Sequence, residues 1–196
     1  EPHEWPSLAR ALFAEEHFRG ARPDGLLIVS RCDESDARMV IYNADGGRPE
    51  ACGNGLRCVG WHLARTRGLS TCSIATDAGP RAVSVEQRAG EVATLRAEMG
   101  SARELGDIAS LPSQVVGLTA RGYDLGNPHC ILLVEDERVA PVEAVGRALQ
   151  GHEAFPRGVN VGFLAQREGQ WYLRVWERGV GETAACGTNA CAAAAF

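Results

Sequence analysis

The chain contains one short pattern twice, a cysteine followed by glycine at the expected start of a helix. Ala51-Cys52-Gly53-Asn54-Gly55 corresponds to Ala185-Cys186-Gly187-Thr188-Asn189. Each cysteine lies nine residues after the polar end of an expected strand, Asn43 in one case and Glu177 in the other. The repeated plan indicates two related halves, each with one helix headed by Cys-Gly.

Hydrophobic periodicity predicts where the strands and helices of the two halves lie. In the first half it predicts helices at 6–19 and 53–67 and strands at 26–29, 39–42, 72–75, 82–87 and 93–99. In the second half it predicts strands at 115–125, 129–134, 160–165 and 171–177, a helix at 142–149 and a last helix at 186–196. The three strands at 72–75, 82–87 and 93–99 should form a meander.

The segment 100–113 has weak periodicity and contains Pro112, so we place the domain junction there. The expected domains are 1–103, which carries Cys52, and 104–196, which carries Cys186. Phe196 stops an alanine-rich helix without a cap, and strands expected to open the first half are missing. We therefore expect a chain that is trimmed at both ends.

Composition excludes several classes of partner. A net charge of −5 lacks the basic footprint that nucleic-acid binding requires. No apolar run is long enough to span a bilayer. Seven cysteines, an odd number, in a chain too large to need disulfides favour reduced thiols in the cytoplasm. We expect no nucleic-acid partner, no membrane contact and a cytoplasmic location.

The chain also lacks the motifs of common cofactors. All 20 basic residues are arginine, so no lysine is present to form a pyridoxal phosphate Schiff base. Neither Cys-Gly segment has the glycine frame of a nucleotide site. Cys52, Cys58 and His62 lie outside the usual zinc-ligand spacing. We expect neither a cofactor nor a metal.

A cysteine at a helix N-terminus suits acid–base chemistry. Free backbone N–H groups and the helix dipole favour the thiolate, and the following glycine lets an anion such as a substrate carboxylate approach the backbone. Inversion of a carbon centre needs one group to remove a proton and another to deliver one from the opposite face. Cys52 and Cys186 are the candidates for these two roles.

Five segments of the chain together resemble one known family. In chain order they are Tyr42-Asn43-Ala44-Asp45-Gly46, Ala51-Cys52-Gly53-Asn54-Gly55-Leu56-Arg57-Cys58, Gly126-Asn127-Pro128-His129, Phe155-Pro156-Arg157-Gly158-Val159-Asn160-Val161 and Glu177-Arg178-Gly179-Val180-Gly181-Glu182-Thr183-Ala184-Ala185-Cys186-Gly187-Thr188. On these residues the chain resembles the diaminopimelate epimerases, which interconvert LL- and meso-2,6-diaminopimelate on the route to lysine and peptidoglycan.

The resemblance implies that Cys52 and Cys186 are the catalytic pair of an isomerase that works without pyridoxal phosphate. It implies that the substrate is bound by Asn43, Gly53, Asn54, Asn127, Asn160, Glu177, Arg178, Gly187 and Thr188. Within this set Arg178 would pair with the distal carboxylate. His129 would be a supporting polar group that helps to orient the substrate ammonium.

The resemblance also implies the fold and the assembly. The fold would be α/β (α+β), with two pseudo-symmetric domains, each a mostly antiparallel sheet wrapped around a central helix, assembled as a homodimer. Asn189 departs from the family because a second glycine normally stands there. Two alternatives stay open, a related racemase that acts on proline, hydroxyproline or histidine, and an inactive amino-acid-binding fragment.

Overall fold

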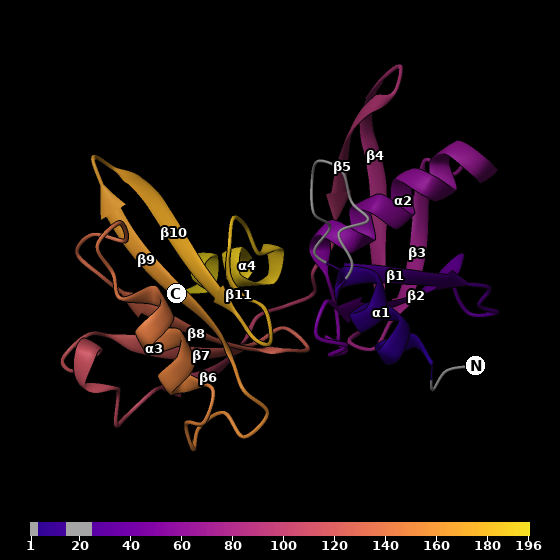
Figure 1. The fold of residues 1–196 in the computed structure, drawn as a ribbon. Helices are drawn as coiled ribbons and strands as arrows, with labels where there is room; N and C mark the ends of the chain where they lie inside the picture. The colour runs from indigo at the N-terminus through magenta and orange to yellow at the C-terminus, as the bar shows by residue number, and fades with distance from the viewer. Residues whose placement is uncertain (1–3, 15–24) are drawn as a thin grey trace. The chain divides into compact units, whose positions relative to one another are not determined.

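The computed structural model describes residues 4–14 and 25–196. The chain divides into two compact units, Glu1–Gly100 (unit 1) and Ser101–Phe196 (unit 2). Each unit has its own sheet and its own helices (Figure 1). In the described residues, no helix is both long and apolar enough to cross a membrane.

Unit 1 is built on a five-stranded sheet with the order β1-β2-β3-β4-β5. Its elements are α1 (Trp5–Ala14), β1 (Gly25–Ser30), β2 (Ala37–Asn43), α2 (Gly53–Arg67), β3 (Thr71–Thr76), β4 (Gly79–Ala89) and β5 (Val92–Ala97). All neighbouring strands are antiparallel except β2 and β3, which are parallel because α2 connects them.

The two faces of this sheet are covered by different helices. On one face Leu56, Val59 and Leu63 of α2 are buried at helical spacing against residues such as Met39 and Ile74. On the other face α1 contributes Ala9 and Phe13 to a smaller cluster around Tyr42. The sheet therefore holds α2, and with it the Cys-Gly segment, in a fixed place within unit 1.

The ends of α2 follow from its sequence. Cys52 is the N-cap in extended conformation (φ −145°, ψ 113°), and its side chain accepts a hydrogen bond from the Gly55 N–H. Gly68 ends the helix in the left-handed conformation (φ 71°), where glycine avoids steric strain. Arg65 and Arg67 in the last turn face the negative end of the helix dipole.

Unit 2 is built on a six-stranded sheet with the order β11-β10-β9-β8-β7-β6. Its elements are β6 (Arg103–Asp107), a 3-10 turn (Ser113–Val115), β7 (Ala120–Asp124), β8 (Pro128–Leu133), α3 (Val142–Leu149), β9 (Asn160–Arg167), β10 (Gln170–Glu177), β11 (Gly181–Thr183) and α4 (Gly187–Ala195). Only β8 and β9 are parallel, and α3 crosses between them.

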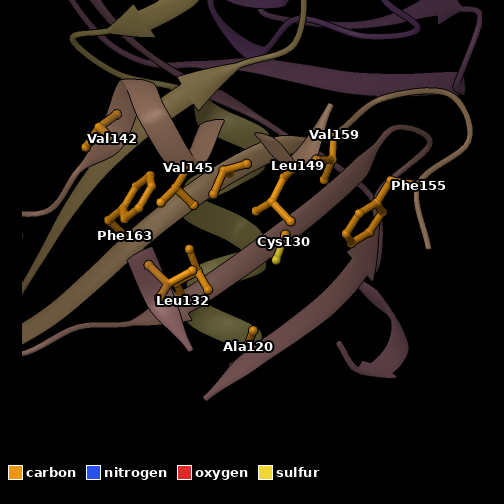
Figure 2. Close-up of a cluster of buried hydrophobic side chains, with 11 residues drawn as sticks. Ala120, Cys130, Leu132, Val142, Val145, Leu149, Phe155, Val159 and Phe163 are labelled. Atoms are coloured by element: carbon orange, nitrogen blue, oxygen red, sulfur yellow. The ribbon is translucent and has the colours of Figure 1, made fainter. Parts of the chain in front are cut away.

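Helices also cover both faces of this second sheet. Val145 and Leu149 of α3 pack in a cluster with Cys130, Leu132 and Phe163, shown in Figure 2. The alternate strand residues, among them Ile131 and Leu164, pack on the other face with Ala192 of α4. Because both faces are buried, β8 is a nearly continuous apolar run.

The structure confirms the expected fold class, with two mostly antiparallel sheets and few helices. The predicted helices at 53–67 and 142–149 and the meander of β3, β4 and β5 are confirmed. The helix predicted at 6–19 is confirmed as α1 as far as Ala14, and residues 15–19 lie outside the described residues.

One strand prediction was wrong, and two strands, β6 and β11, were not predicted. Residues 103–107, assigned to the junction, form β6, an edge strand with exposed charged side chains and no regular apolar alternation. The strand predicted at 115–125 begins only at Ala120, because a 3-10 turn and Gly117 (φ 88°) precede it. The short strand β11 was not predicted at all.

Candidate active site

In unit 1, Cys52 lies at the N-terminus of α2 with its sulfur turned toward the first helical turn. Its Sγ accepts a hydrogen bond from the Gly55 N–H at 3.3 Å. Gly53 and Asn54 are the first two residues of the helix, so their N–H groups have no acceptor inside it. Their positions suit an anion held beside the half-buried sulfur.

Asn43 ends β2 and opens a tight loop that leads toward Cys52. The Asn43 N–H donates to the Gly47 carbonyl at 2.8 Å, and its carbonyl accepts from the Gly46 N–H at 2.9 Å. Asp45 Oδ1 closes the loop by accepting from the Gly47 N–H. We call Asn43, Cys52, Gly53 and Asn54 the Cys52 group.

In unit 2, Cys186 has the same place at the head of α4. It is the N-cap in extended conformation (φ −130°, ψ 116°), and its Sγ lies 3.4 Å from Thr188 Oγ1. Gly187 and Thr188 supply the first two N–H groups of the helix. The two cysteines therefore share one backbone conformation, whereas the capping hydrogen bond that Cys52 accepts from its helix has no counterpart at Cys186 among the described residues.

The surroundings of Cys186 keep its thiol protonated. Burial raises the pKa of Cys186 to about 12, and the negative charge of Glu177 acts in the same direction. The Thr188 hydroxyl and the backbone N–H of Asn189 lower the pKa by a smaller amount. Glu177 in turn accepts a hydrogen bond from the Thr183 hydroxyl.

A second set of polar residues lies at the start of β8 and β9 in unit 2. Asn160 is buried, and its Nδ2 donates to the Pro128 carbonyl at 3.2 Å. Its Oδ1 accepts from the Arg178 N–H at 3.0 Å. The Arg178 guanidinium donates to the Arg157 carbonyl at 3.1 Å. Asn160 thus fixes the backbone directly after Glu177.

His129 is fully buried beside this set, and Asn127 is almost fully buried. The His129 Nε2 and Asn127 Oδ1 atoms are 2.9 Å apart. Burial, assisted by the Arg178 charge and opposed by Asp124, lowers the pKa of His129 to about 3. The imidazole is therefore neutral, and because the amide oxygen only accepts, Nε2 carries the hydrogen.

Eight predicted site residues belong to unit 2, and we call them the Cys186 group. They are Asn127, His129, Asn160, Glu177, Arg178, Cys186, Gly187 and Thr188. Glu177 and Arg178 are adjacent and connect the polar set at β8 and β9 to the cysteine. Among residues 4–14 and 25–196, no three His, Cys, Asp or Glu side chains are placed to hold a metal ion.

Comparison with known proteins identifies the family. The family model described as diaminopimelate epimerase matches residues 2–105 and 123–196. The chain is 41% identical to the diaminopimelate epimerase of Moorella thermoacetica, over 98% of this chain and 74% of that protein. It is 35% identical to that of Methanococcus maripaludis, over 95% and 73%. The chain belongs to the diaminopimelate epimerase family.

Solved structures with low identity share the fold of this diaminopimelate epimerase family member. A probable proline racemase from Agrobacterium radiobacter has a TM-score of 0.72 at 18% identity, over 97% of this chain and 65% of that one. A predicted epimerase from Pseudomonas aeruginosa has a TM-score of 0.70 at 18% identity, over 100% and 70%. At this identity the likeness shows the fold alone.

The structure shows contacts of two residues of this diaminopimelate epimerase family member that the sequence did not predict. Thr183 was part of a recognised motif, but its hydrogen bond to Glu177 became visible only in the structure. Asn189, the departure from the expected glycine, is fully buried with its side chain against Gly162 of β9. The sheet therefore accommodates the larger side chain.

Proposed function

We propose that this chain epimerises LL-2,6-diaminopimelate to the meso form by a two-cysteine acid/base mechanism without pyridoxal phosphate. The observation that carries this proposal is the shared geometry of Cys52 and Cys186, each the N-cap of a helix headed by glycine. Membership of the diaminopimelate epimerase family supports the substrate. Units 1 and 2 would be the two half-domains of the enzyme.

The protonation state of Cys186 supports its role as the acid. Its raised pKa keeps the hydrogen on sulfur at neutral pH. In the proposed reaction Cys52, as thiolate, removes the α-hydrogen as a proton, and Cys186 delivers its own proton to the opposite face of the carbon. After this step Cys52 is the thiol and Cys186 is the thiolate, which is the state that starts the reverse direction. Both sulfurs exchange protons with solvent before the next LL substrate reacts.

The helix N-termini would bind the carboxylate at the reacting end. Gly53 and Asn54 in unit 1, and Gly187 and Thr188 in unit 2, present N–H groups without an acceptor in their own helix. These donors would stabilise the charge that develops on the carboxylate as the α-hydrogen leaves. Such stabilisation is needed because no cofactor is proposed to take up the electrons.

The remaining Cys186-group residues suit the other substrate groups. The Nδ1 atom of His129 is buried and has no hydrogen-bond partner among the described residues. As an unprotonated nitrogen it can accept a hydrogen bond from the substrate ammonium, and the Glu177 carboxylate can accept another. Asn127 would hold the His129 ring. Arg178, tied at its backbone by Asn160, would pair with the distal carboxylate.

Asn43 completes the proposed substrate contacts from unit 1. It stands at the end of β2, as Glu177 stands at the end of β10, and each precedes its cysteine by nine residues. Because Asn43 and Glu177 have equivalent positions in the two units, we expect both to contact the substrate. Asn43 would supply an amide where Glu177 supplies a carboxylate.

The test is turnover of purified enzyme with LL-diaminopimelate under reducing conditions, followed by chromatography of the stereoisomers. We expect the meso form to accumulate, and Cys52→Ala and Cys186→Ala each to abolish its formation. Cys58→Ala in α2 and Cys191→Ala in α4 are matched controls on the same helices and should remain active. Full activity in either Cys52→Ala or Cys186→Ala would contradict the pairing.

A substrate panel distinguishes the alternatives. Conversion of proline, hydroxyproline or histidine in place of diaminopimelate would indicate the related racemase. Calorimetric binding of diaminopimelate without turnover would indicate a binding module. A homodimer and a cytoplasmic location are further predictions, which light scattering and cell fractionation test. We also expect full activity after extensive dialysis against a chelator, because neither metal nor cofactor is proposed.

A further inference from the structure

Asn189 is a buried polar residue whose side chain makes no hydrogen bond with the described part of the chain. It is 0% exposed, and neither Oδ1 nor Nδ2 has a partner there. An unpaired buried amide costs stability, so its presence needs an explanation. Its location suggests one, since Asn189 is the third residue of α4.

The side chain of Asn189 fills space that Gly162 leaves open. A Cβ atom added to Gly162 would lie far inside van der Waals contact with Asn189 Oδ1. The same Cβ would also approach Ile131 and Leu173, so this part of β9 is closely packed. Asn189 is therefore wedged between the first turn of α4 and the sheet.

In unit 1 the corresponding helix and strand residues also pack closely, but there the strand residue is large and the helix residue is glycine. Leu27 and Gly162 are equivalent, because each pairs with the residue two before the strand end that precedes the cysteine. Gly55 and Asn189 are equivalent as third helix residues. A Cβ added to Gly55 would lie 2.9 Å from Leu27 Cδ2. A large strand residue faces glycine in unit 1, and glycine faces a large helix residue in unit 2.

The wedged residue is also the one whose backbone faces the thiol. The backbone N–H of Asn189 lowers the pKa of the Cys186 thiol. It occupies the position in α4 that the Gly55 N–H, which donates to Cys52 Sγ, occupies in α2. The direction of this N–H depends on where the first turn of α4 lies on the sheet. The side chain that fixes this turn therefore also fixes the donor.

We propose that Asn189 is a positioning residue for Cys186: its side chain, seated against Gly162, holds the first turn of α4 so that its own N–H points at the sulfur. The role depends on the shape of the side chain and not on its amide, which makes no hydrogen bond with the described residues. The effect of this contact on catalysis rests on the proposed function. The packing of Asn189 against Gly162 does not depend on it.

The test measures how fast iodoacetamide alkylates Cys186, relative to Cys191 in the same helix, by peptide mass spectrometry from about pH 8 to about pH 10. Asn189→Gly should slow the relative rate about tenfold, because loss of an ordered N–H donor beside the sulfur disfavours the reactive thiolate. Asn189→Leu has nearly the same heavy-atom shape and should stay within about twofold of wild type.

A compensating pair tests the contact itself. Gly162→Ala should slow alkylation as Asn189→Gly does, because the new methyl group pushes the helix turn away. The double variant Gly162→Ala/Asn189→Gly should react faster than Gly162→Ala alone, since the collision is gone. Gly122→Ala on β7 is the control, because its Cβ would meet Leu105 and Ile108 instead of α4.

An unchanged rate in Asn189→Gly, strictly additive effects in the pair, or a slow Asn189→Leu would each overturn the proposal. If Gly162→Ala fails to fold, the comparison of Asn189→Gly with Asn189→Leu still decides. The readout needs no substrate, so it stands even if the epimerase proposal fails. In an active enzyme, Asn189→Gly should lower kcat while KM stays near wild type, and Asn189→Leu should restore kcat.

Discussion

The hydroxyl of Thr183 donates a hydrogen bond to Oε1 of Glu177, the carboxylate whose charge raises the pKa of the Cys186 thiol. Thr183 lies in β11, a strand of only three residues that pairs with the end of β10. This pairing holds the hydroxyl where it can orient the carboxylate. A short edge strand thus takes part in setting the chemistry at the head of α4.

Thr183→Val should impair turnover without loss of the fold. The variant keeps the branched shape but removes the donor, so the Glu177 carboxylate loses its fixed orientation. We expect kcat to fall about tenfold, the value of one hydrogen bond to a charged group. Steady-state kinetics check this result, and Thr183→Ser, which keeps the hydroxyl, should retain most activity. Equal activity of the Val and Ser variants would exclude the orienting role.

Glu177→Gln should make Cys186 more reactive toward alkylation. Removing the negative charge beside the thiol stabilises the thiolate, so the pKa of Cys186 should fall. Peptide-resolved alkylation at about pH 9 should then be faster than in wild type. Glu182→Gln is a suitable control, because Glu182 is an exposed acid paired with Arg174. A slower reaction in Glu177→Gln would contradict the electrostatic account.

His129→Gln should reduce the loss of stability in acid. Burial lowers the pKa of His129 from 6.5 to about 3, so below pH 6.5 the unfolded chain takes up a proton that the folded chain does not. The stability that this histidine contributes is lost as the pH falls from 6.5 toward 3. The loss amounts to at most about 5 kcal/mol.

Chemical denaturation at several pH values measures this effect. Between pH 6.5 and 3, the unfolding free energy of His129→Gln should fall less than that of wild type, since glutamine does not titrate. Half-buried His152 provides the control variant His152→Gln. A His129→Gln variant with the wild-type slope would show that His129 is not held neutral in the folded protein.

Gly60→Ala should destabilise unit 1, although alanine favours helices. A Cβ at residue 60 would lie 2.5 Å from Val83 Cγ1, because α2 packs closely on β4. Overpacking costs about 1–3 kcal/mol, which exceeds the gain in helix propensity of about 1 kcal/mol. Thermal denaturation should show a lower Tm, and Val83→Ala should partly rescue it. A higher Tm for Gly60→Ala would contradict the close packing.

Much of the fold could be predicted from the sequence because its helices and central strands carry strong periodic signals. Val142, Val145 and Leu149 mark α3 by their helical spacing, and both faces of β8 are apolar. Edge strands lack such a signal. In β6 the charged residues Arg103, Glu104 and Asp107 are exposed, so only pairing with β7 defines the strand.

Parts of the candidate site depend on contacts that are distant in sequence and could not be predicted. The motifs identified the cysteines and the amides, including Asn160, but not that Asn160 bonds to the Arg178 backbone. The contact of Asn189 with Gly162 joins a helix to a strand that precedes it by 27 positions. No local pattern encodes the fact that a glycine on β9 makes room for a side chain on α4.

Reaction in deuterated water tests the two-cysteine account most directly. Wild-type enzyme acting on LL-diaminopimelate should place solvent deuterium at the inverted α-carbon, because the delivering thiol carries a solvent-exchanged hydrogen. Cys52→Ala and Cys186→Ala should each give no labelled meso product, as mass spectrometry and proton NMR would show. Labelled meso product formed at the wild-type rate by a variant that lacks either cysteine would contradict the account.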